Sequence, residues 1–282
     1  PGTGKTMMAA RLPGLLPELT DQEALESAAI ASVSGRAVAP QHWRQRPFRS
    51  PHHTASAVAM VGGGPVPRPG EISLAHHGVL FLDELPEFDR KVLEVLREPL
   101  ESGQIVVSRA ARQTTFPASF QLIAAMNPCP CGYAGHPQHE CGCTDFQVQR
   151  YRQKISGPLL DRFDIHVEVP ALEISELQHA SRSETSAQVR ARVISARASA
   201  IKRSGVTNQQ LQGKALEQFC ELQTDDKSML EGALQQLGMS ARSYYRLLKV
   251  ARTLADLSGA EAIASVHLLE ALSMRALDRR GR

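Results

Sequence analysis

The chain opens with a glycine-rich loop that leads into a helix, and this loop limits the possible folds more than any other feature. Its first residues, P-G-T-G-K-T, match the phosphate-binding pattern G-x-x-x-x-G-K-[ST] without the first glycine. Backbone N–H groups of Gly2, Thr3 and Gly4 can surround phosphates. The Lys5 ammonium can reach the β- and γ-phosphates, and the Thr6 hydroxyl can hold Mg²⁺. The sequence therefore predicts an α/β domain that binds a nucleotide.

Acidic side chains follow a buried strand further along the chain. The apolar run over 79–82 predicts a parallel strand, and Asp83 and Glu84 come directly after it. A second apolar strand is expected over 122–126, followed by Asn127. Because parallel strands deliver their ends to one edge of a sheet, these polar groups should meet the phosphate loop. Asp83 could then hold Mg²⁺, Glu84 could polarise a water, and the Asn127 amide could orient that water.

Length and composition are those of a globular protein with two domains. Of the 282 residues, 42% are hydrophobic and 22% are charged, and the formal net charge of +3 is too small to indicate nucleic-acid binding alone. No apolar run approaches the ~18 residues that a membrane span needs, so we expect a cytoplasmic protein. An α/β core is expected over 1–170, a linker over 171–186 and a helical domain over 187–282.

Local patterns predict several further elements. Leu93, Leu96 and Leu100 share one face of an expected helix that stops near Gly103. The segments 105–107 and 116–120 suggest a hairpin, and the alternation over 163–169 suggests a half-exposed strand. Later helices are expected after caps at Thr224 and Ser240, and over 265–277. The chain is also expected to be N-terminally truncated, with the missing strand next to the one that ends at Asp83.

Four of the five cysteines fall in one short window with the spacing C-x-C-x₉-C-x-C. They are Cys129, Cys131, Cys141 and Cys143. Four thiolates can close a tetrahedral zinc site, although this spacing is tighter than the usual C-x₂₋₄-C. His136 and His139 lie between the pairs and could replace a thiol. A reduced, metal-free loop remains the alternative. The neighbouring histidines at 52–53 and 76–77 are expected to make packing or polar contacts instead.

Taken together, the motifs resemble a known family. The order of the phosphate loop, F-L-D-E, a strand ending in Asn and S-G-P-L-L-D-R-F-D resembles an AAA+ ATPase of the helix-2-insert branch. The segments R-P-F-R-S-P-H-H-T, G-G-G-P-V-P-R-P-G-E-I-S-L-A-H-H-G and N-P-C-P-C-G resemble the ComM/YifB family, magnesium-chelatase-like AAA+ proteins. S-A-R-S-Y-Y-R-L-L-K-V-A-R-T-L-A-D-L fits the same family, and the match extends to about residue 275. Residues 187–282 would then form the α-helical lid.

The resemblance implies roles for several arginines. Arg162 matches the arginine finger that reaches the γ-phosphate in a neighbouring subunit, and Arg242 matches the residue called sensor 2. A finger requires a neighbour, so a homo-hexamer is implied. Studied members of the family behave as DNA helicases that promote branch migration in natural transformation. The expected DNA contacts are Arg109 and Arg112 at the hairpin tip, and Arg49 and Arg68 in the long loop before F-L-D-E.

Two other functions stay open on the sequence alone. The same motifs occur in magnesium-chelatase ATPase subunits, which spend ATP on inserting a metal into a porphyrin. A non-enzymatic ATP-binding assembly module is the second alternative. ATP and Mg²⁺ are the expected cofactors of the DNA motor and of the chelatase subunit. Zn²⁺ is a possible further cofactor.

Overall fold

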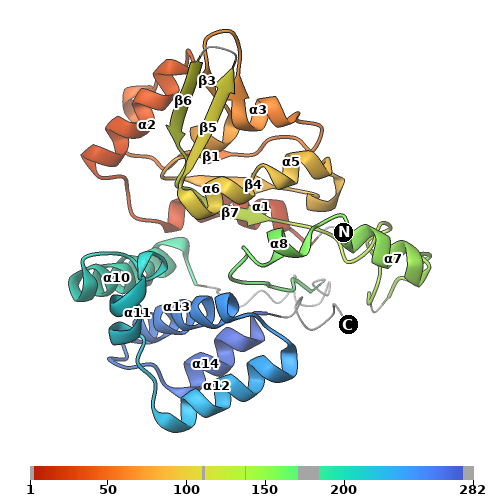
Figure 1. Ribbon diagram of the computed structural model, residues 1–282, viewed down its shortest axis with the longest axis vertical. Helices are drawn as coiled ribbons and strands as arrows, with labels where there is room; N and C mark the ends of the chain where they lie inside the picture. Colours follow the sequence, from red (N-terminus) through yellow and green to blue (C-terminus); the bar gives the residue numbers. More distant parts are fainter. Residues whose placement is uncertain (1–2, 110–111, 137, 171–183, 276–282) are drawn as a thin grey trace. The chain divides into compact units, whose positions relative to one another are not determined.

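The computed structural model describes residues 3–109, 112–136, 138–170 and 184–275. These residues divide into two compact units (Figure 1). Unit 1 holds the described residues up to Arg162, with Pro170, and unit 2 holds 163–169 with the described residues from 184 onward. Residues 171–183 of the expected linker lie outside the described part. Among the described residues, no helix is both long enough and apolar enough to cross a membrane.

A parallel sheet of three strands forms the centre of unit 1. The strand order is β1 (Phe48–Arg49), β4 (Val79–Leu82) and β7 (Gln121–Ala124). Every residue of β4 is buried, which confirms the strand predicted from the apolar run. Since β4 has a hydrogen-bonded neighbour on each side, a further strand cannot lie beside it. The expectation that a missing strand lies next to β4 is therefore wrong.

Short helices and turns surround this sheet (Figure 1). The helices described in unit 1 are α1 (Lys5–Arg11), α2 (Asp21–Val33), α3 (Ala57–Val61), α4 (Glu71–Leu74), α5 (Arg90–Glu94), α6 (Arg97–Ser102), α7 (Asp145–Arg152) and α8 (Gly157–Leu160). The 3-10 turns are η1 (Leu12–Leu15), η2 (Pro40–His42) and η3 (Leu85–Glu87). Thr20 caps α2 and Thr144 caps α7, each in a capping box that satisfies two backbone N–H groups at the helix start.

The segment predicted as one leucine-faced helix is divided into α5 and α6. Pro99 has no N–H group, so it cannot donate the hydrogen bond that would continue α5 through Val95. Gly103 then ends α6 in the left-handed conformation. The expected hairpin follows, with β5 (Gln104–Arg109) antiparallel to β6 (Arg112–Pro117). Its second strand lies earlier in the chain than the predicted segment 116–120. A smaller antiparallel pair joins β2 (Gly62–Gly63) to β3 (Arg68–Pro69).

The alternating segment 163–169 does not form the expected strand. Its single described bridge joins His166 to Arg275, and the segment belongs to unit 2. The Arg275 guanidinium also donates to the carbonyl of Phe163. An alternating segment needs a neighbouring strand to form a sheet, and its partner here is the single bridge residue Arg275, so the prediction is wrong.

Unit 2 is built from helices, as the sequence predicts. They are α10 (Ser186–Ser204), η4 (Asn208–Gln210), α11 (Gly213–Phe219), α12 (Thr224–Leu237), α13 (Ala241–Ser258) and α14 (Ser265–Ser273). Ser240 caps α13 as expected, whereas Gln223, one residue before Thr224, is the N-cap of α12. Leu230, Leu247 and Leu268 are almost fully buried in the core that α12, α13 and α14 share.

A buried ionic cluster joins three elements of unit 2. Asp256 accepts hydrogen bonds from Arg203 at 2.6 and 2.8 Å, from Arg252 at 3.0 Å and from Asn208 at 2.7 Å. The side chains of Arg252 and Asp256 are each 2% exposed. Arg252 also donates to the carbonyls of Ala260 and Glu261. The carboxylate therefore compensates buried positive charge that has little access to water.

Replacing this carboxylate by an amide should destabilise unit 2. In Asp256→Asn the guanidinium of Arg252 stays buried without a counter-charge, so we expect the free energy of unfolding to fall by about 3–5 kcal/mol. Urea unfolding followed by far-ultraviolet circular dichroism, which is dominated by helices, measures this loss. The matched control is Asp225→Asn at an exposed position of α12. Equal unfolding curves for the two variants would contradict the argument.

A buried histidine should make the stability of unit 1 depend on pH. Burial, reinforced by the neighbouring His77, lowers the pKa of His76 to about 4, and the His76 Nδ1 accepts from the Ser119 N–H at 3.0 Å. The unfolded chain binds a proton near the ordinary histidine pKa of about 6.5, while the folded chain does not. The free energy of unfolding is therefore highest above pH 6.5 and decreases as the pH falls toward 4. For one proton, the decrease is at most about 1.4 kcal/mol per pH unit.

Trp43 lies in unit 1 and is the single tryptophan of the chain, so its fluorescence can follow this unfolding. Unfolding free energies measured between pH 7 and pH 4.5 should fall less steeply in His76→Asn than in the unchanged chain. Identical slopes would show that His76 does not cause the dependence.

Candidate functional site

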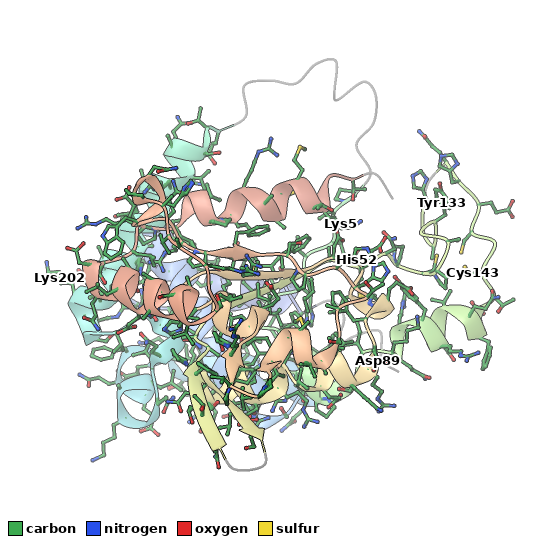
Figure 2. The ribbon with its side chains drawn as sticks, turned by 90° about the horizontal axis from the view of Figure 1, so that it is seen from above. Lys5, His52, Asp89, Tyr133, Cys143 and Lys202 are labelled. Atoms are coloured by element: carbon green, nitrogen blue, oxygen red, sulfur yellow. The ribbon has the colours of Figure 1, made fainter. Side chains whose placement is uncertain are left out.

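The phosphate-loop residues lie at the start of α1. Gly4 is the N-cap of this helix and adopts a left-handed conformation with φ of 74°, which glycine accommodates without strain. Gly2, the other glycine of the motif, lies outside the described residues. Lys5 and Thr6 occupy the first turn of the helix. Figure 2 shows Lys5 and His52 at the same end of the unit.

The Thr6 hydroxyl reaches the strand-end acid that the sequence singled out. Its Oγ1 donates to Asp83 Oδ2 at 2.5 Å, although the two residues are far apart in the chain. The other carboxylate oxygen, Asp83 Oδ1, accepts from the backbone N–H of Glu84 at 2.9 Å. This second bond fixes the orientation of the carboxylate. A hydroxyl and a carboxylate oxygen therefore face one another, and Mg²⁺ prefers such oxygen ligands.

Lys5 connects the loop to the neighbouring strand. Its Nζ donates to Thr3 Oγ1 at 3.1 Å and lies 3.4 Å from Asn127 Oδ1. Strand β7 ends at Ala124, two residues earlier than predicted, so Asn127 stands on the loop that follows. The structure thus brings Thr3, Lys5, Thr6, Asp83 and Asn127 together at one edge of the sheet.

Glu84 has an unusual backbone conformation and a partner that local sequence patterns do not indicate. Its φ of 53° is left-handed, which is uncommon for a residue with a side chain. The Glu84 carboxylate is 55% exposed and lies 3.2 Å from His53 Nδ1. The His53 ring packs against His52 and Phe88. The histidines at 52–53, within R-P-F-R-S-P-H-H-T, therefore make the packing and polar contacts expected of them, and His53 supplies a contact to the strand-end acid.

Arg162 contacts an acid of its own unit. Its guanidinium lies 2.5 Å from Glu101 Oε1 and donates to the carbonyl of Pro158. The Arg162 side chain is only 6% exposed. A finger role would therefore require the guanidinium to exchange Glu101 for a phosphate oxygen.

The other arginines that were predicted to contact DNA or the nucleotide differ in their exposure and in their partners. Arg49 forms a two-pronged ion pair with Glu71, at 2.5 and 2.8 Å, so its guanidinium is already occupied. Arg68 is exposed on β3. Arg109 and Arg112 pair with one another at the hairpin end, as predicted, and their side chains are outside the described set. Arg242 is exposed at the second position of α13, in unit 2.

A second histidine pair makes the polar contacts that the sequence analysis favoured. His77 Nε2 lies 2.7 Å from Glu26 Oε2, and the ring centroids of His76 and His77 lie 3.8 Å apart with their planes tilted by 39°. The three side chains could together surround an ion. However, His76 Nδ1 already accepts a backbone hydrogen bond and His77 is paired with Glu26, so contacts within the unit account for the group.

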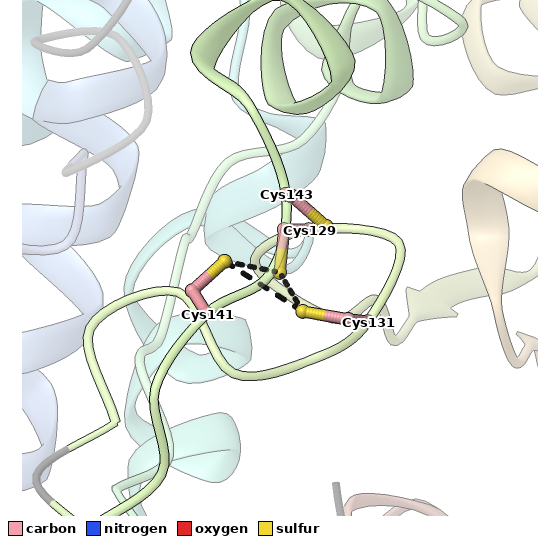
Figure 3. Close-up of side chains that lie close together, drawn as sticks. All are labelled: Cys129, Cys131, Cys141 and Cys143. Atoms are coloured by element: carbon pink, nitrogen blue, oxygen red, sulfur yellow. Dashed lines mark hydrogen bonds between the residues drawn. The ribbon is translucent and has the colours of Figure 1, made fainter.

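The four clustered cysteines converge on one point of the loop after β7 (Figure 3). All are free thiols, and Cys129 is fully buried. A backbone hydrogen bond at Tyr133, together with the Cys129 thiol, lowers the pKa of Cys131 to about 6. A backbone bond at Cys143 favours the Cys141 thiolate, but burial and the neighbouring thiols outweigh it and raise the pKa of Cys141 to about 12. The four groups therefore cannot all ionise unless a cation compensates them.

The chain is similar to known proteins over nearly its whole length. Residues 1–177 match the family model described as magnesium chelatase, subunit ChlI, and residues 183–275 match the model for the C-terminal part of that subunit. The uncharacterized protein YifB of Salmonella typhimurium is 54% identical over 281 residues, which are 99% of this chain and 55% of the relative. The competence protein ComM of Haemophilus influenzae is 53% identical, with the same coverage.

A more distant relative is the magnesium-chelatase 38 kDa subunit of Cereibacter sphaeroides, which is 26% identical over 77% of this chain and 58% of the relative. The chain spans about half the length of YifB and ComM. The two family models together cover both units, and the identity to YifB and ComM extends over nearly the whole chain. The chain therefore belongs to the magnesium chelatase ChlI family of AAA+ proteins, in its ComM/YifB branch.

Proposed function

We propose that the protein containing this chain hydrolyses ATP with Mg²⁺ in a homo-hexamer and uses the energy to move DNA strands. The observation that carries the proposal is the convergence of Thr6 with Asp83 and of Lys5 with Asn127. A turn before a helix and the ends of two parallel strands supply these groups. Such an edge is where nucleotides bind in open α/β sheets.

In the proposed magnesium site, Thr6 and Asp83 would exchange their mutual hydrogen bond for the ion. Both offer oxygen ligands of the kind that Mg²⁺ takes, and the Glu84 N–H holds the Asp83 carboxylate in place. When bound, the ion would neutralise charge on the β- and γ-phosphates. Lys5 adds a second positive charge beside Asn127, on the side of the loop where the γ-phosphate is expected.

Glu84 is the proposed general base. Its exposed carboxylate can accept a proton from water while the water oxygen attacks the γ-phosphorus and the bond to the β,γ-bridging oxygen breaks. His53 contacts the same carboxylate and would hold it in position. Asn127 would orient the water or the γ-phosphate through its amide. Sensor 2 stays the proposed role of Arg242, on its match to the family motif.

DNA is the proposed partner because the competence protein ComM is 53% identical to this chain, whereas the magnesium-chelatase 38 kDa subunit is 26% identical. Arg68, Arg109 and Arg112 are the proposed phosphate contacts. Arg49 is a weaker candidate because Glu71 occupies it. The competing proposal, a chelatase-type ATPase, has support from the matching family model and from the 38 kDa subunit.

Single-stranded DNA should stimulate ATP hydrolysis, and removing the base should abolish both the basal and the stimulated rates. We expect Glu84→Gln to lower the rate by at least about 100-fold while ATP binding is kept, because the amide cannot accept the proton. Phosphate release with and without DNA, at two salt concentrations, measures this. Stimulation should weaken as salt rises, since phosphate contacts release counterions.

The matched control is Glu98→Gln, a neighbouring exposed acid on α6 outside the site, which should hydrolyse at the unchanged rate. Hydrolysis that ignores DNA would favour the chelatase-type function. No hydrolysis by the assembled protein would favour the non-enzymatic module.

Mixing two inactive variants should restore activity if Arg162 acts on a neighbour. Arg162→Ala keeps an intact phosphate loop, and Lys5→Ala keeps an intact Arg162. Each alone should lose about 10³-fold or more. In mixed rings the Lys5→Ala subunits supply the guanidinium, so phosphate release should recover to a substantial fraction of the unchanged rate.

A purely intrachain role for Arg162, through its pair with Glu101, predicts no recovery on mixing. Glu101→Gln separates the two roles further. This substitution removes the negative charge of Glu101 and leaves Arg162 unchanged. The variant should keep hydrolysing ATP if Arg162 acts on the γ-phosphate in a neighbouring subunit.

A further inference from the structure

We propose that the loop after β7 binds one zinc ion through Cys129, Cys131, Cys141 and Cys143, and that this metal holds Asn127 in place. The metal site stands on the cysteine geometry alone. The positioning role rests additionally on the proposed function, in which Asn127 faces the γ-phosphate.

The separations between the sulfur atoms fit a tetrahedral ion. Cys129 Sγ lies 3.3 Å from Cys131 Sγ and 3.7 Å from Cys141 Sγ, and the latter two are 3.6 Å apart. The Cys143 sulfur also lies within 4.8 Å of the other three (Figure 3). Four sulfurs at 2.3 Å from a zinc ion in a tetrahedron would be about 3.8 Å apart. The loop is therefore close to the required arrangement without any change in its path.

A backbone N–H group also points at the buried sulfur of the cluster. Ala134 N lies 3.3 Å from Cys129 Sγ. Hydrogen bonds of this kind from the surrounding shell tune thiolate ligands.

A disulfide or a mixed cysteine–histidine site fits the cluster less well than four thiolates around one ion. A disulfide requires about 2.05 Å between sulfurs, and the described cysteines are all free thiols. The ligand atoms that gather at the cluster come from the four cysteines and not from His136 or His139, and His136 Nδ1 accepts from the N–H groups of Gln138 and His139. The two imidazoles instead pack with Tyr133. Four thiolates in a tetrahedron select zinc or iron among the common ions, and zinc is the one we propose.

The cysteine loop is connected directly to the nucleotide edge. Cys129 follows Asn127 by two residues, and the Arg152 guanidinium donates to the intervening carbonyl of Pro128 at 3.2 and 3.3 Å. A metal that closes the loop between Cys129 and Cys143 would therefore fix both the chain leaving Asn127 and the start of α7. An amide on a loop, rather than on a strand, can keep a defined position in this way.

The test measures metal content in the purified chain, with no need for ATP hydrolysis. Elemental analysis should give about one zinc per chain and no stoichiometric iron. A mercurial reagent should release this zinc to a chromogenic chelator. Cys131→Ser and Cys141→Ser should lose most of the zinc, whereas the matched control Cys220→Ser, in the core of unit 2, should keep it.

Hydrogen–deuterium exchange of the segment around 125–134 tests the positioning role. In the cysteine variants, and in the unchanged chain after mercurial release, exchange there should become at least about 10-fold faster, while the helices of unit 2 keep their rates. The zinc site would be overturned if the elemental analysis found stoichiometric iron. It would also be overturned if the folded chain held no metal and its four clustered thiols were reactive. Zinc loss with unchanged exchange at 125–128 would overturn the positioning role. Neither result depends on whether the protein is an ATPase.

Discussion

The parallel pairing of β4 with β7 is the constraint on which the proposed site depends. Because Leu82 pairs with Ala124, both strands end at the same level, and the chain beyond each of them enters the same small region. The Leu85 N–H then donates to the Ala125 carbonyl at 2.9 Å, so the two exits stay attached past the sheet itself. The phosphate loop completes the edge through Thr6 and Lys5. A change of register by one residue would turn the side chains after each strand away from one another.

Unit 2 achieves its order by a different route. Its helices share an apolar core, and a buried carboxylate between two guanidiniums connects α10, η4 and α13. Burying such charges is costly, and the cost is offset only when every partner is present. The arrangement therefore favours one particular packing of the helices over alternatives that a leucine-rich core alone would tolerate. Arg242, at the exposed start of α13, depends on that packing for its position.

Much of the fold could be predicted from local patterns, because short apolar runs, capping residues and glycines act within a few residues of one another. The buried strand before Asp83, the β5–β6 hairpin and the Ser240 cap are examples. Features that depend on distant partners could not be predicted. The contact of His53 with Glu84 and the pair of Arg162 with Glu101 each join segments that no pattern relates. The segment 163–169 alternates like a strand, yet its partner in unit 2 is the single bridge residue Arg275.

The left-handed backbone at Glu84 has a consequence for the evolution of the protein. A residue with a side chain costs roughly 1–2 kcal/mol in this conformation, whereas glycine adopts it freely. A chain selected for stability alone would thus favour glycine or asparagine at this position. Under the proposed function, in which Glu84 is the general base, a glutamate there gives up stability where the carboxylate is needed, so stabilising substitutions at this turn would be gained at the expense of activity.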